Sequence, residues 1–244
     1  PVRIPGPSHV GATLSRSRAW GHREPPEVTM KRTPRATSQP AFWDARYQLE
    51  GYAFGEQPDP FVAARLSFLE GAGAISVPAR IADLGAGEGR VAVHAAERGH
   101  HVTAVDFAGA GLAMARSLAT KRSVCIDVAE ENLTTWLPRE PLDVAILLLV
   151  HLLPEARGRV LANMPALLRP GGWLIARWFH EAHAARGTFG PSKRDRLVTA
   201  QTIRDALPGG TLHQCARRSV LMASGRYLHG EADVLDVVWQ APAP

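Results

Sequence analysis

The stretch that decides the fold is RIADLGAGEGR, residues 80–90. Its first half is apolar like a buried β-strand, its middle is a glycine-rich turn, and its end can begin a helix. Glycine at alternate positions allows a tight turn and lets the backbone approach a ligand that a Cβ atom would hold away. Asp83 lies at the end of the strand, where a carboxylate can meet a cation or a polar hydrogen. The stretch therefore predicts a strand–turn–helix unit with a ligand beside the turn.

A second apolar strand, VTAVD at residues 102–106, also ends in an acid. In α/β nucleotide-binding folds an acid at this place holds the ribose hydroxyls of an adenosine group. Because the carboxyl ends of parallel strands meet at one edge of a sheet, Asp83 and Asp106 should lie near the same turn. Two strand ends, one loop and two acids predict a cofactor site.

Strands and helices alternate along the rest of the chain. The predicted strands span residues 81–84, 101–105, 123–127, 143–149 and 173–178, followed by an antiparallel pair at 212–223 and 227–240. The predicted helices span residues 41–47, 58–71, 89–98, 109–119, 154–168 and 199–207. This order predicts an α/β fold with a Rossmann-like, doubly wound, mostly parallel seven-stranded sheet and an antiparallel C-terminal strand pair. Asp127 and residues 149–151 are then expected at the same carboxyl edge as the two acids.

Charge and composition divide the chain into two parts. The formal net charge is +5, and residues 1–38 account for all of it, with seven basic and two acidic residues. These residues are also rich in proline and poor in apolar side chains, so we expect a disordered N-terminal extension. Residues 39–244 are expected to form a single domain with lid helices at its start. Since the ordered part carries no excess charge, nucleic acid is not favoured as a partner.

Other functional classes find little support in the sequence. No apolar run reaches about 18 residues and no signal sequence is evident, so we expect a soluble cytoplasmic protein without membrane contact. Cys125, in a predicted core strand, should be buried, and with Cys215 far away neither a disulfide nor a cysteine metal site is expected. The pair His180 and His183 alone does not indicate a metal.

The glycine spacing distinguishes between adenosine cofactors. It reads D-x-G-x-G-x-G, and Arg90 is too large for the third small position of the dinucleotide motif. This spacing resembles motif I of the class I S-adenosylmethionine-dependent methyltransferases, whose cofactor has no pyrophosphate to cradle. The segments FWDARY (42–47), YAFGEQP (52–58), LRPGG (168–172) and GTFGP (187–191) extend the resemblance over residues 42–239. They are similar to the small tellurite-resistance type, which shares its front end with thiopurine methyltransferases.

The resemblance implies a role for each matching residue. The loop around the methionine part of the cofactor would comprise Gly85, Ala86, Gly87, Gly89 and Arg90, with Asp83 and Leu149 at neighbouring strand ends. The adenosine part would be held by Asp106 at the ribose, Phe107 on the adenine, Asp127 at the adenine amino group and Val128 beside it. A lid over the cofactor would comprise Trp43, Arg46 and Tyr47. Ordinary helix packing also explains Trp43 and Tyr47, and a turn or helix cap also explains Asp127.

The implied activity is methyl transfer from S-adenosylmethionine to a small-molecule acceptor, for example a thiol or a chalcogen oxyanion. A soft acceptor needs little help, whereas a hydroxyl or amine needs a general base, for which His151 is best placed. His180 and His183 are candidates for the acceptor pocket, and Arg177 stands where the subgroup more often has an acid. The motifs of DNA methyltransferases are missing from the sequence. The alternative is a catalytically silent cofactor-binding or interaction module.

Overall fold

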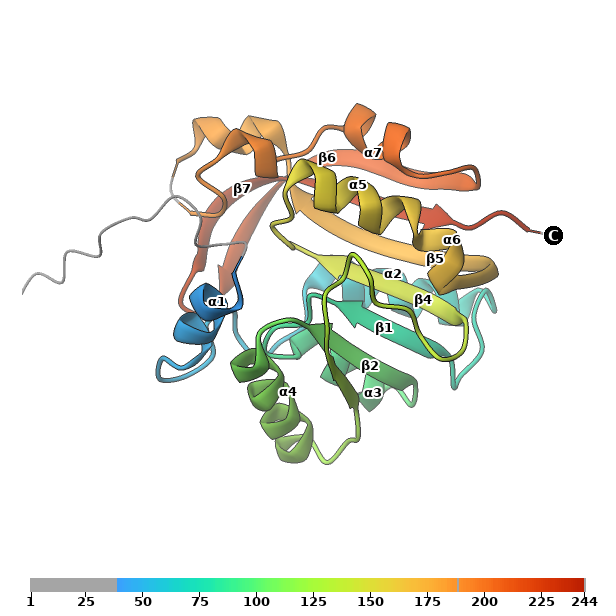
Figure 1. The fold of residues 1–244 in the computed structure, drawn as a ribbon, viewed down its shortest axis with the longest axis horizontal. Helices are drawn as coiled ribbons and strands as arrows, with labels where there is room; N and C mark the ends of the chain where they lie inside the picture. Colours follow the sequence, from blue (N-terminus) through green and yellow to red (C-terminus); the bar gives the residue numbers. More distant parts are fainter. Residues whose placement is uncertain (1–38, 188, 244) are drawn as a thin grey trace, which may run out of the picture. The chain divides into compact units, whose positions relative to one another are not determined.

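A computed structural model of the chain describes residues 39–187 and 189–243. A seven-stranded sheet with the order β3-β2-β1-β4-β5-β7-β6 forms its centre (Figure 1). The strands are β1 (Arg80–Leu84), β2 (His101–Asp106), β3 (Asp127–Glu130), β4 (Leu142–Leu148), β5 (Leu168–Phe179), β6 (Thr211–Ser224) and β7 (Leu228–Gln240). The pairs β5–β7 and β6–β7 are antiparallel, and the others are parallel. The predicted fold class is confirmed.

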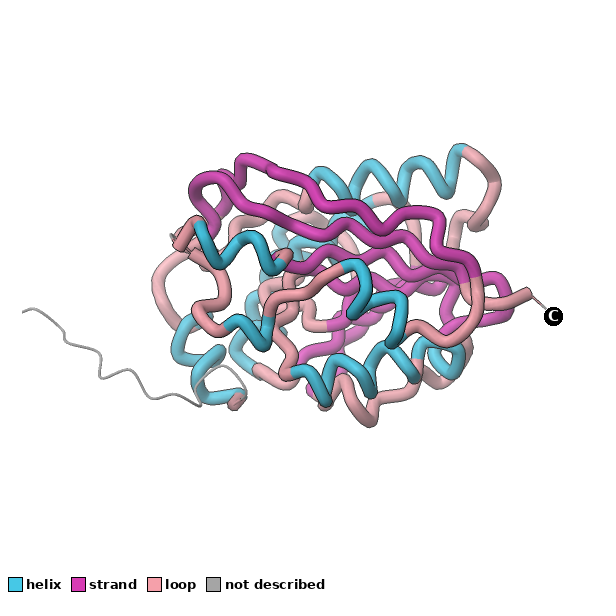
Figure 2. The backbone as a smooth tube through the Cα atoms, turned by 90° about the horizontal axis from the view of Figure 1, so that it is seen from above, coloured by secondary structure: helices cyan, strands magenta, loops and turns pink. Residues whose placement is uncertain are grey.

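Helices cover both faces of the sheet, which Figure 2 shows edge-on with cyan helices beside magenta strands. The α-helices are α1 (Pro40–Tyr47), α2 (Pro60–Gly71), α3 (Arg90–Glu97), α4 (Gly109–Lys121), α5 (Pro154–Ala162), α6 (Met164–Leu167) and α7 (Ala200–Ala206). Two 3₁₀ helices, η2 (Glu181–Ala185) and η3 (Arg194–Arg196), follow β5. Helices α2 and α3 pack on one face and α5, α6 and α7 on the other, so the sheet lies between two apolar layers.

Strand β4 shows why the sheet is buried on both sides. Successive side chains of a strand point to opposite faces. Val144 and Ile146 pack in the layer that contains α2 and α3, whereas Ala145 and Leu147 pack in the layer that contains α5 to α7. A continuous apolar run is therefore what a central parallel strand requires.

The predicted third strand, 123–127, is wrong. After α4 the chain turns through Ser123, whose φ is 57°, and enters the sheet only at Asp127. Asp127 pairs with Thr103, and Glu130 pairs with Asp106. Asp127 therefore begins β3 instead of ending it. The expected burial of Cys125 is also wrong, because this residue lies before the strand and is exposed.

Two further boundaries differ from the prediction. The helix expected at 154–168 divides into α5 and α6, and Pro165 lies in the first turn of α6, where a missing amide is tolerated. The segment 169–172, expected to separate helix and strand, belongs to β5, and the β4–β5 register shifts between Leu142 and Val144. The two glycines of this segment, Gly171 and Gly172, therefore lie within β5 next to the register shift. Among the described residues, no helix is long and apolar enough to cross a membrane.

Candidate functional site

The glycine loop folds tightly around the end of β1. Gly85, Gly87 and Gly89 all have positive φ, at 78°, 51° and 79°. A Cβ atom on Gly89 would lie 2.5 Å from the Ala115 Cβ atom, and one on Gly85 would lie 2.5 Å from the Val150 side chain. Glycine is therefore required at these positions both by the backbone conformation and by close packing.

Asp106 lies at the end of β2 and contacts the glycine loop directly. Its carboxylate accepts hydrogen bonds from the Gly87 N–H at 2.8 Å and the Ala108 N–H at 2.9 Å. The side chain is buried, and burial raises the pKa of Asp106 above its usual value. The acid thus sits where loop, strand end and the start of α4 meet, as the sequence predicts for Asp106.

Asp83 has a different environment from the one expected for a ligand-facing acid. It is buried, and its Oδ2 atom accepts a hydrogen bond from the Ala92 N–H in the first turn of α3 at 3.0 Å. This amide is among those that a helix N-terminus leaves without an internal partner. Burial raises the pKa of Asp83 to about 7. Asp83 therefore fixes α3 behind the glycine loop from inside the fold.

Helix α1 brings Tyr47, one of the predicted lid residues, against the loop. A Cβ atom on Gly87 would lie 2.6 Å from the Tyr47 hydroxyl, and one on Gly111 would lie 2.9 Å from the Tyr47 ring. Trp43 stacks on Tyr47 with ring centroids 6.1 Å apart. The Asp44 carboxylate accepts from the Ala110 N–H at 2.9 Å and so attaches α1 to the start of α4. Tyr47 thus lies against the loop, and Trp43 packs on Tyr47.

Glu88 and Arg90 hold the segment that follows the lid helix, a function that sequence reasoning missed for Glu88. The Glu88 carboxylate accepts from the Ala53 N–H at 2.7 Å and the Phe54 N–H at 2.9 Å. Arg90 donates to the Phe54 carbonyl at 3.1 Å and to the Ser224 hydroxyl at 3.2 Å. We call this arrangement the 53–54 clasp. Its partners are backbone groups of Ala53 and Phe54 and the hydroxyl of Ser224, all far away in sequence, so no local pattern could reveal it.

The end of β4 forms another part of the same edge. Leu149 has a φ of 56°, which is a strained conformation for leucine, and its N–H donates to the Arg177 carbonyl at 2.7 Å. The His151 ring lies 5.9 Å from the Trp43 ring and 5.8 Å from the Phe179 ring, centroid to centroid. Burial among these groups, with Arg196 and Arg46 nearby, lowers the pKa of His151 to about 4. The imidazole is therefore neutral at physiological pH.

The two histidines after β5 have structural hydrogen bonds. His183 is buried, and its Nδ1 atom accepts from the Asp233 N–H at 3.3 Å. Its Nε2 atom lies 2.9 Å from the Phe189 carbonyl, to which it donates. Both nitrogens of His183 are thus used, so it does not present a free nitrogen to an acceptor. His180 accepts from the Ala182 N–H at 3.1 Å and caps η2.

The residue that departs from the subgroup pattern, Arg177, joins three elements inside the fold. It donates to both oxygens of Asp236 on β7, at 2.6 and 2.9 Å. It also donates to both oxygens of Asp59, the N-cap of α2, at 3.0 Å. Arg177 is buried and paired with two acids, so its place in the sequence reflects packing of β5, β7 and α2.

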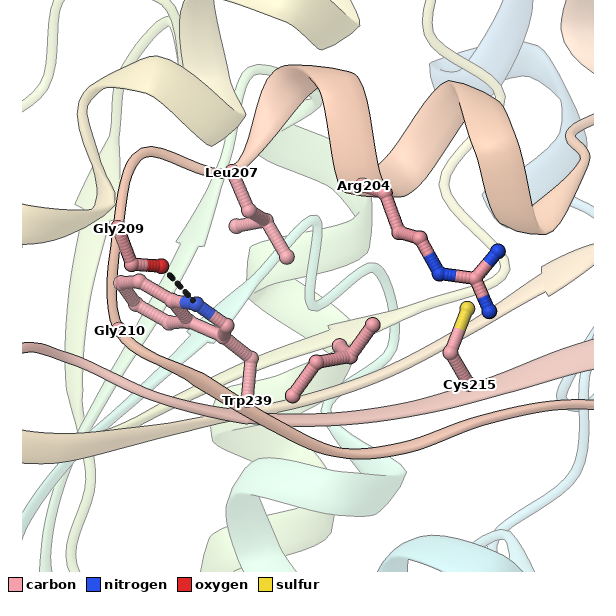
Figure 3. Close-up of a pocket in the computed structure, with 7 residues that line it drawn as sticks. Arg204, Leu207, Gly209, Gly210, Cys215 and Trp239 are labelled. Carbon is pink, nitrogen blue, oxygen red and sulfur yellow. Dashed lines mark hydrogen bonds between the residues drawn. The ribbon is translucent and has the colours of Figure 1, made fainter.

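A separate pocket of about 350 Å³ lies between α7 and the β6–β7 pair, and it contains none of the predicted site residues (Figure 3). Trp239 and Gly209 line this pocket, and the Trp239 indole N–H donates to the Gly209 carbonyl at 3.0 Å. Among residues 39–187 and 189–243, no group of three or more His, Cys, Asp or Glu side chains could hold a metal ion.

Comparison with known proteins bears on the class of protein. Residues 81–172 match the family model for the methyltransferase domain, which covers the glycine loop, Asp106 and the end of β4. No curated protein sequence matches the chain. Residues 81–172 are thus similar to a methyltransferase domain, and the seven-stranded α/β fold agrees with that likeness.

Solved structures share the fold at low sequence identity. The N-methyltransferase NodS from Bradyrhizobium japonicum, in complex with S-adenosylhomocysteine, has a TM-score of 0.61 and 17% identity, covering 85% of this chain and 99% of its own. TehB from Haemophilus influenzae has a TM-score of 0.60 and 13% identity, and the match covers 82% of this chain and 66% of TehB. A third structure was solved in work on the conversion of a disulfide bond into a thioacetal group during echinomycin biosynthesis. It has a TM-score of 0.64 and 19% identity, and the match covers 83% of this chain and 92% of that protein.

Proposed function

We propose that the protein transfers a methyl group from S-adenosylmethionine to a small-molecule acceptor at the carboxyl ends of β1, β2 and β4. The observation that carries this proposal is the contact between the Asp106 carboxylate and the Gly87 amide under the lid of α1. In this proposal the Asp106 carboxylate takes the ribose hydroxyls, as charge-assisted hydrogen bonds favour. The glycine loop with Ala86 and Arg90 surrounds the methionine part, and Phe107 lies on the adenine.

The adenine amino group needs an acceptor near the end of β3. We place Glu130 there instead of Asp127, because Glu130 is level with Asp106 and Asp127 is level with Thr103. The Glu130 carboxylate also lies near the first residue of α4, since a Cβ on Gly109 would be 2.9 Å from its Oε2 atom. Val128, between the two acids, packs among apolar residues of the core. Glu130→Gln should weaken S-adenosylhomocysteine binding more than Asp127→Asn.

The acceptor side of the site favours a soft nucleophile such as a thiol or a chalcogen oxyanion. Bound S-adenosylmethionine would supply an activated methyl group on a sulfonium, whose sulfur keeps the electrons of the broken bond and becomes a neutral thioether. The chain's own task is then to align the acceptor and exclude water, and the rings of Trp43, Phe54 and Phe179 line this end of the sheet. With a pKa of about 4, His151 is a weak base, so it serves a thiol mainly by accepting a hydrogen bond from it.

An acceptor screen tests this function. Purified protein is incubated with S-adenosylmethionine carrying a radioactive methyl group and with thiols, selenite, tellurite, a phenol or an amine. We expect methyl transfer to a thiol or chalcogen compound, and a loss of about 10²-fold or more in kcat for His151→Ala if the acceptor must lose a proton. Transfer only to the phenol or the amine would contradict the proposed acceptor class.

A further inference from the structure

Arg196, which sequence reasoning did not single out, is a buried cation with an incomplete set of partners. It ends η3, its exposed fraction is 7%, and its Nη1 atom donates to the His151 carbonyl at 2.6 Å. Within the part of the chain that the structure describes, Arg196 forms no ion pair with a carboxylate. Burying a guanidinium without an anion is costly, so such a group is expected to have a negative partner.

Arg177 shows how the same fold treats an arginine with a purely structural function. Its exposed fraction is 6%, close to that of Arg196, but two carboxylates, Asp59 and Asp236, bind it. Arg196 has a backbone carbonyl in place of these two acids. Arg157, with an exposed fraction of 6%, resembles Arg196: it donates to a backbone carbonyl, that of Asp195 at 3.3 Å, and pairs with no carboxylate of the described residues. What distinguishes Arg196 is that its carbonyl partner belongs to His151.

The position of Arg196 connects it to the proposed acceptor side. The carbonyl that it contacts belongs to His151, whose ring lies between Trp43 and Phe179. Arg46 lies over the Tyr227 ring at 4.2 Å and forms no ion pair among the described residues either. Both cations lower the pKa of the same imidazole, so their positive potential converges at the end of β4. An anion bound there would meet positive charge and aromatic surfaces together.

We propose that Arg196 binds an anionic oxygen group of the methyl acceptor, and that the acceptor is an organic acid. This inference rests on the proposed function and adds the chemical class of the substrate. A guanidinium presents paired N–H donors that match a carboxylate, and such charge-assisted hydrogen bonds are strong. The rings of Trp43 and Phe179 favour an apolar body on the same molecule over a bare inorganic oxyanion.

A simple structural role for Arg196, as a clamp on the loop after β4, makes a different prediction. A clamp should be needed for stability. A cation retained for a ligand should be replaceable, because an apolar side chain relieves the burial of charge. We therefore expect Arg196→Met to keep or raise the thermal unfolding midpoint and to lose anion binding. The matched control is Arg194→Met, which removes an exposed cation from the same 3₁₀ helix.

The experiment is a calorimetric titration with benzoate, benzamide and sulfate, in the presence and absence of saturating S-adenosylhomocysteine. We expect benzoate to bind the wild-type chain at least tenfold more tightly than benzamide and sulfate. Arg196→Met should weaken benzoate binding at least tenfold, whereas Arg194→Met should change it less than twofold. S-adenosylhomocysteine affinity should stay within twofold in both variants.

Three results would overturn the inference. Equal affinities of the wild-type chain for benzoate and benzamide would show that the site does not require a negative charge on the ligand. This comparison does not depend on the folding of any variant. Sulfate binding as tight as benzoate would identify a site for a bare oxyanion. A parallel loss of S-adenosylhomocysteine affinity in Arg196→Met would assign the arginine to the cofactor carboxylate. Failure of the wild-type chain to bind S-adenosylhomocysteine would instead contradict the proposed function, and the titrations without it would still test Arg196.

Discussion

Asp106 is the side chain on which the proposed cofactor site depends most. It has two backbone donors already, and a bound ribose would add charge-assisted hydrogen bonds to the same carboxylate. We expect Asp106→Ala to weaken S-adenosylhomocysteine binding at least tenfold, which corresponds to about 1.4 kcal/mol. Equilibrium dialysis measures this, with Asp127→Ala as a control that should change the affinity less than twofold. Equal affinities in Asp106→Ala and the wild-type chain would contradict the ribose assignment.

Asp83 makes stability depend on pH in a defined window. Its pKa is about 7 in the fold because burial disfavours the charged carboxylate, and about 3.9 in the unfolded chain. As the pH rises from about 4 to 7, the unfolded state releases this proton first, so the free energy of unfolding falls by up to about 1.4 kcal/mol per pH unit. Asp83→Asn cannot ionise and lacks this contribution.

Chemical denaturation of both chains between pH 4.5 and 8 tests this pH dependence. The wild-type chain should lose stability relative to Asp83→Asn up to about pH 7 and run parallel to it above that value. Parallel curves over the whole range would show that Asp83 ionises normally in the fold.

At the scale of an element, the start of α3 depends on a glycine that side chains cannot replace. Gly89 has a φ of 79°, and an added Cβ would lie 2.5 Å from the Ala115 Cβ atom. Strain and overpacking together should make Gly89→Ala at least about 2 kcal/mol less stable. Gly158, inside α5, has no atom near an added Cβ, so Gly158→Ala should gain about 0.4–1 kcal/mol. Urea denaturation compares the two, and similar effects would contradict the packing of α3 on α4.

The 53–54 clasp connects the glycine loop with the segment after the lid helix. Glu88→Gln keeps the shape of the side chain and weakens its two bonds from backbone amides, because a neutral amide replaces a charged acceptor. We expect faster hydrogen exchange at the Ala53 and Phe54 amides in this variant, with unchanged exchange in β4. Hydrogen exchange with mass spectrometry measures it. Unchanged protection at Ala53 and Phe54 would show that other contacts hold the segment.

The elements that the sequence predicts well are those with strong local patterns. The loop at 80–90, the acid at 106 and the apolar run of β4 all specify their structure within a few residues. Strand β3 was misplaced because its residues alternate weakly and the left-handed turn at Ser123 has no glycine to mark it. The hydrogen bonds of Glu88, Arg177 and Arg196 join residues 34 to 118 positions apart, and a single sequence contains no signal for such contacts.

At the scale of the whole molecule, the candidate site is assembled from parts of the chain that are distant in sequence. Helix α1, the glycine loop, the end of β4 and the β6–β7 turn all meet there, and Ser224 accepts from Arg90 at 3.2 Å. A ligand that binds these parts only in the fold must stabilise the entire chain. S-adenosylhomocysteine at 100 times its dissociation constant should therefore raise the free energy of unfolding by about 2.7 kcal/mol. Denaturation with and without the ligand measures this, and an unchanged midpoint would contradict it.

The central claim, that this edge of the sheet binds S-adenosylmethionine, is tested most directly by isothermal titration calorimetry. The purified chain is titrated with S-adenosylmethionine, S-adenosylhomocysteine and NADH. The predicted result is micromolar binding of the first two and no binding of NADH. Arg90 occupies the third small position of the dinucleotide motif, so the loop does not fit the pyrophosphate of NADH. Binding of NADH alone, or of none of the three, would contradict the claim.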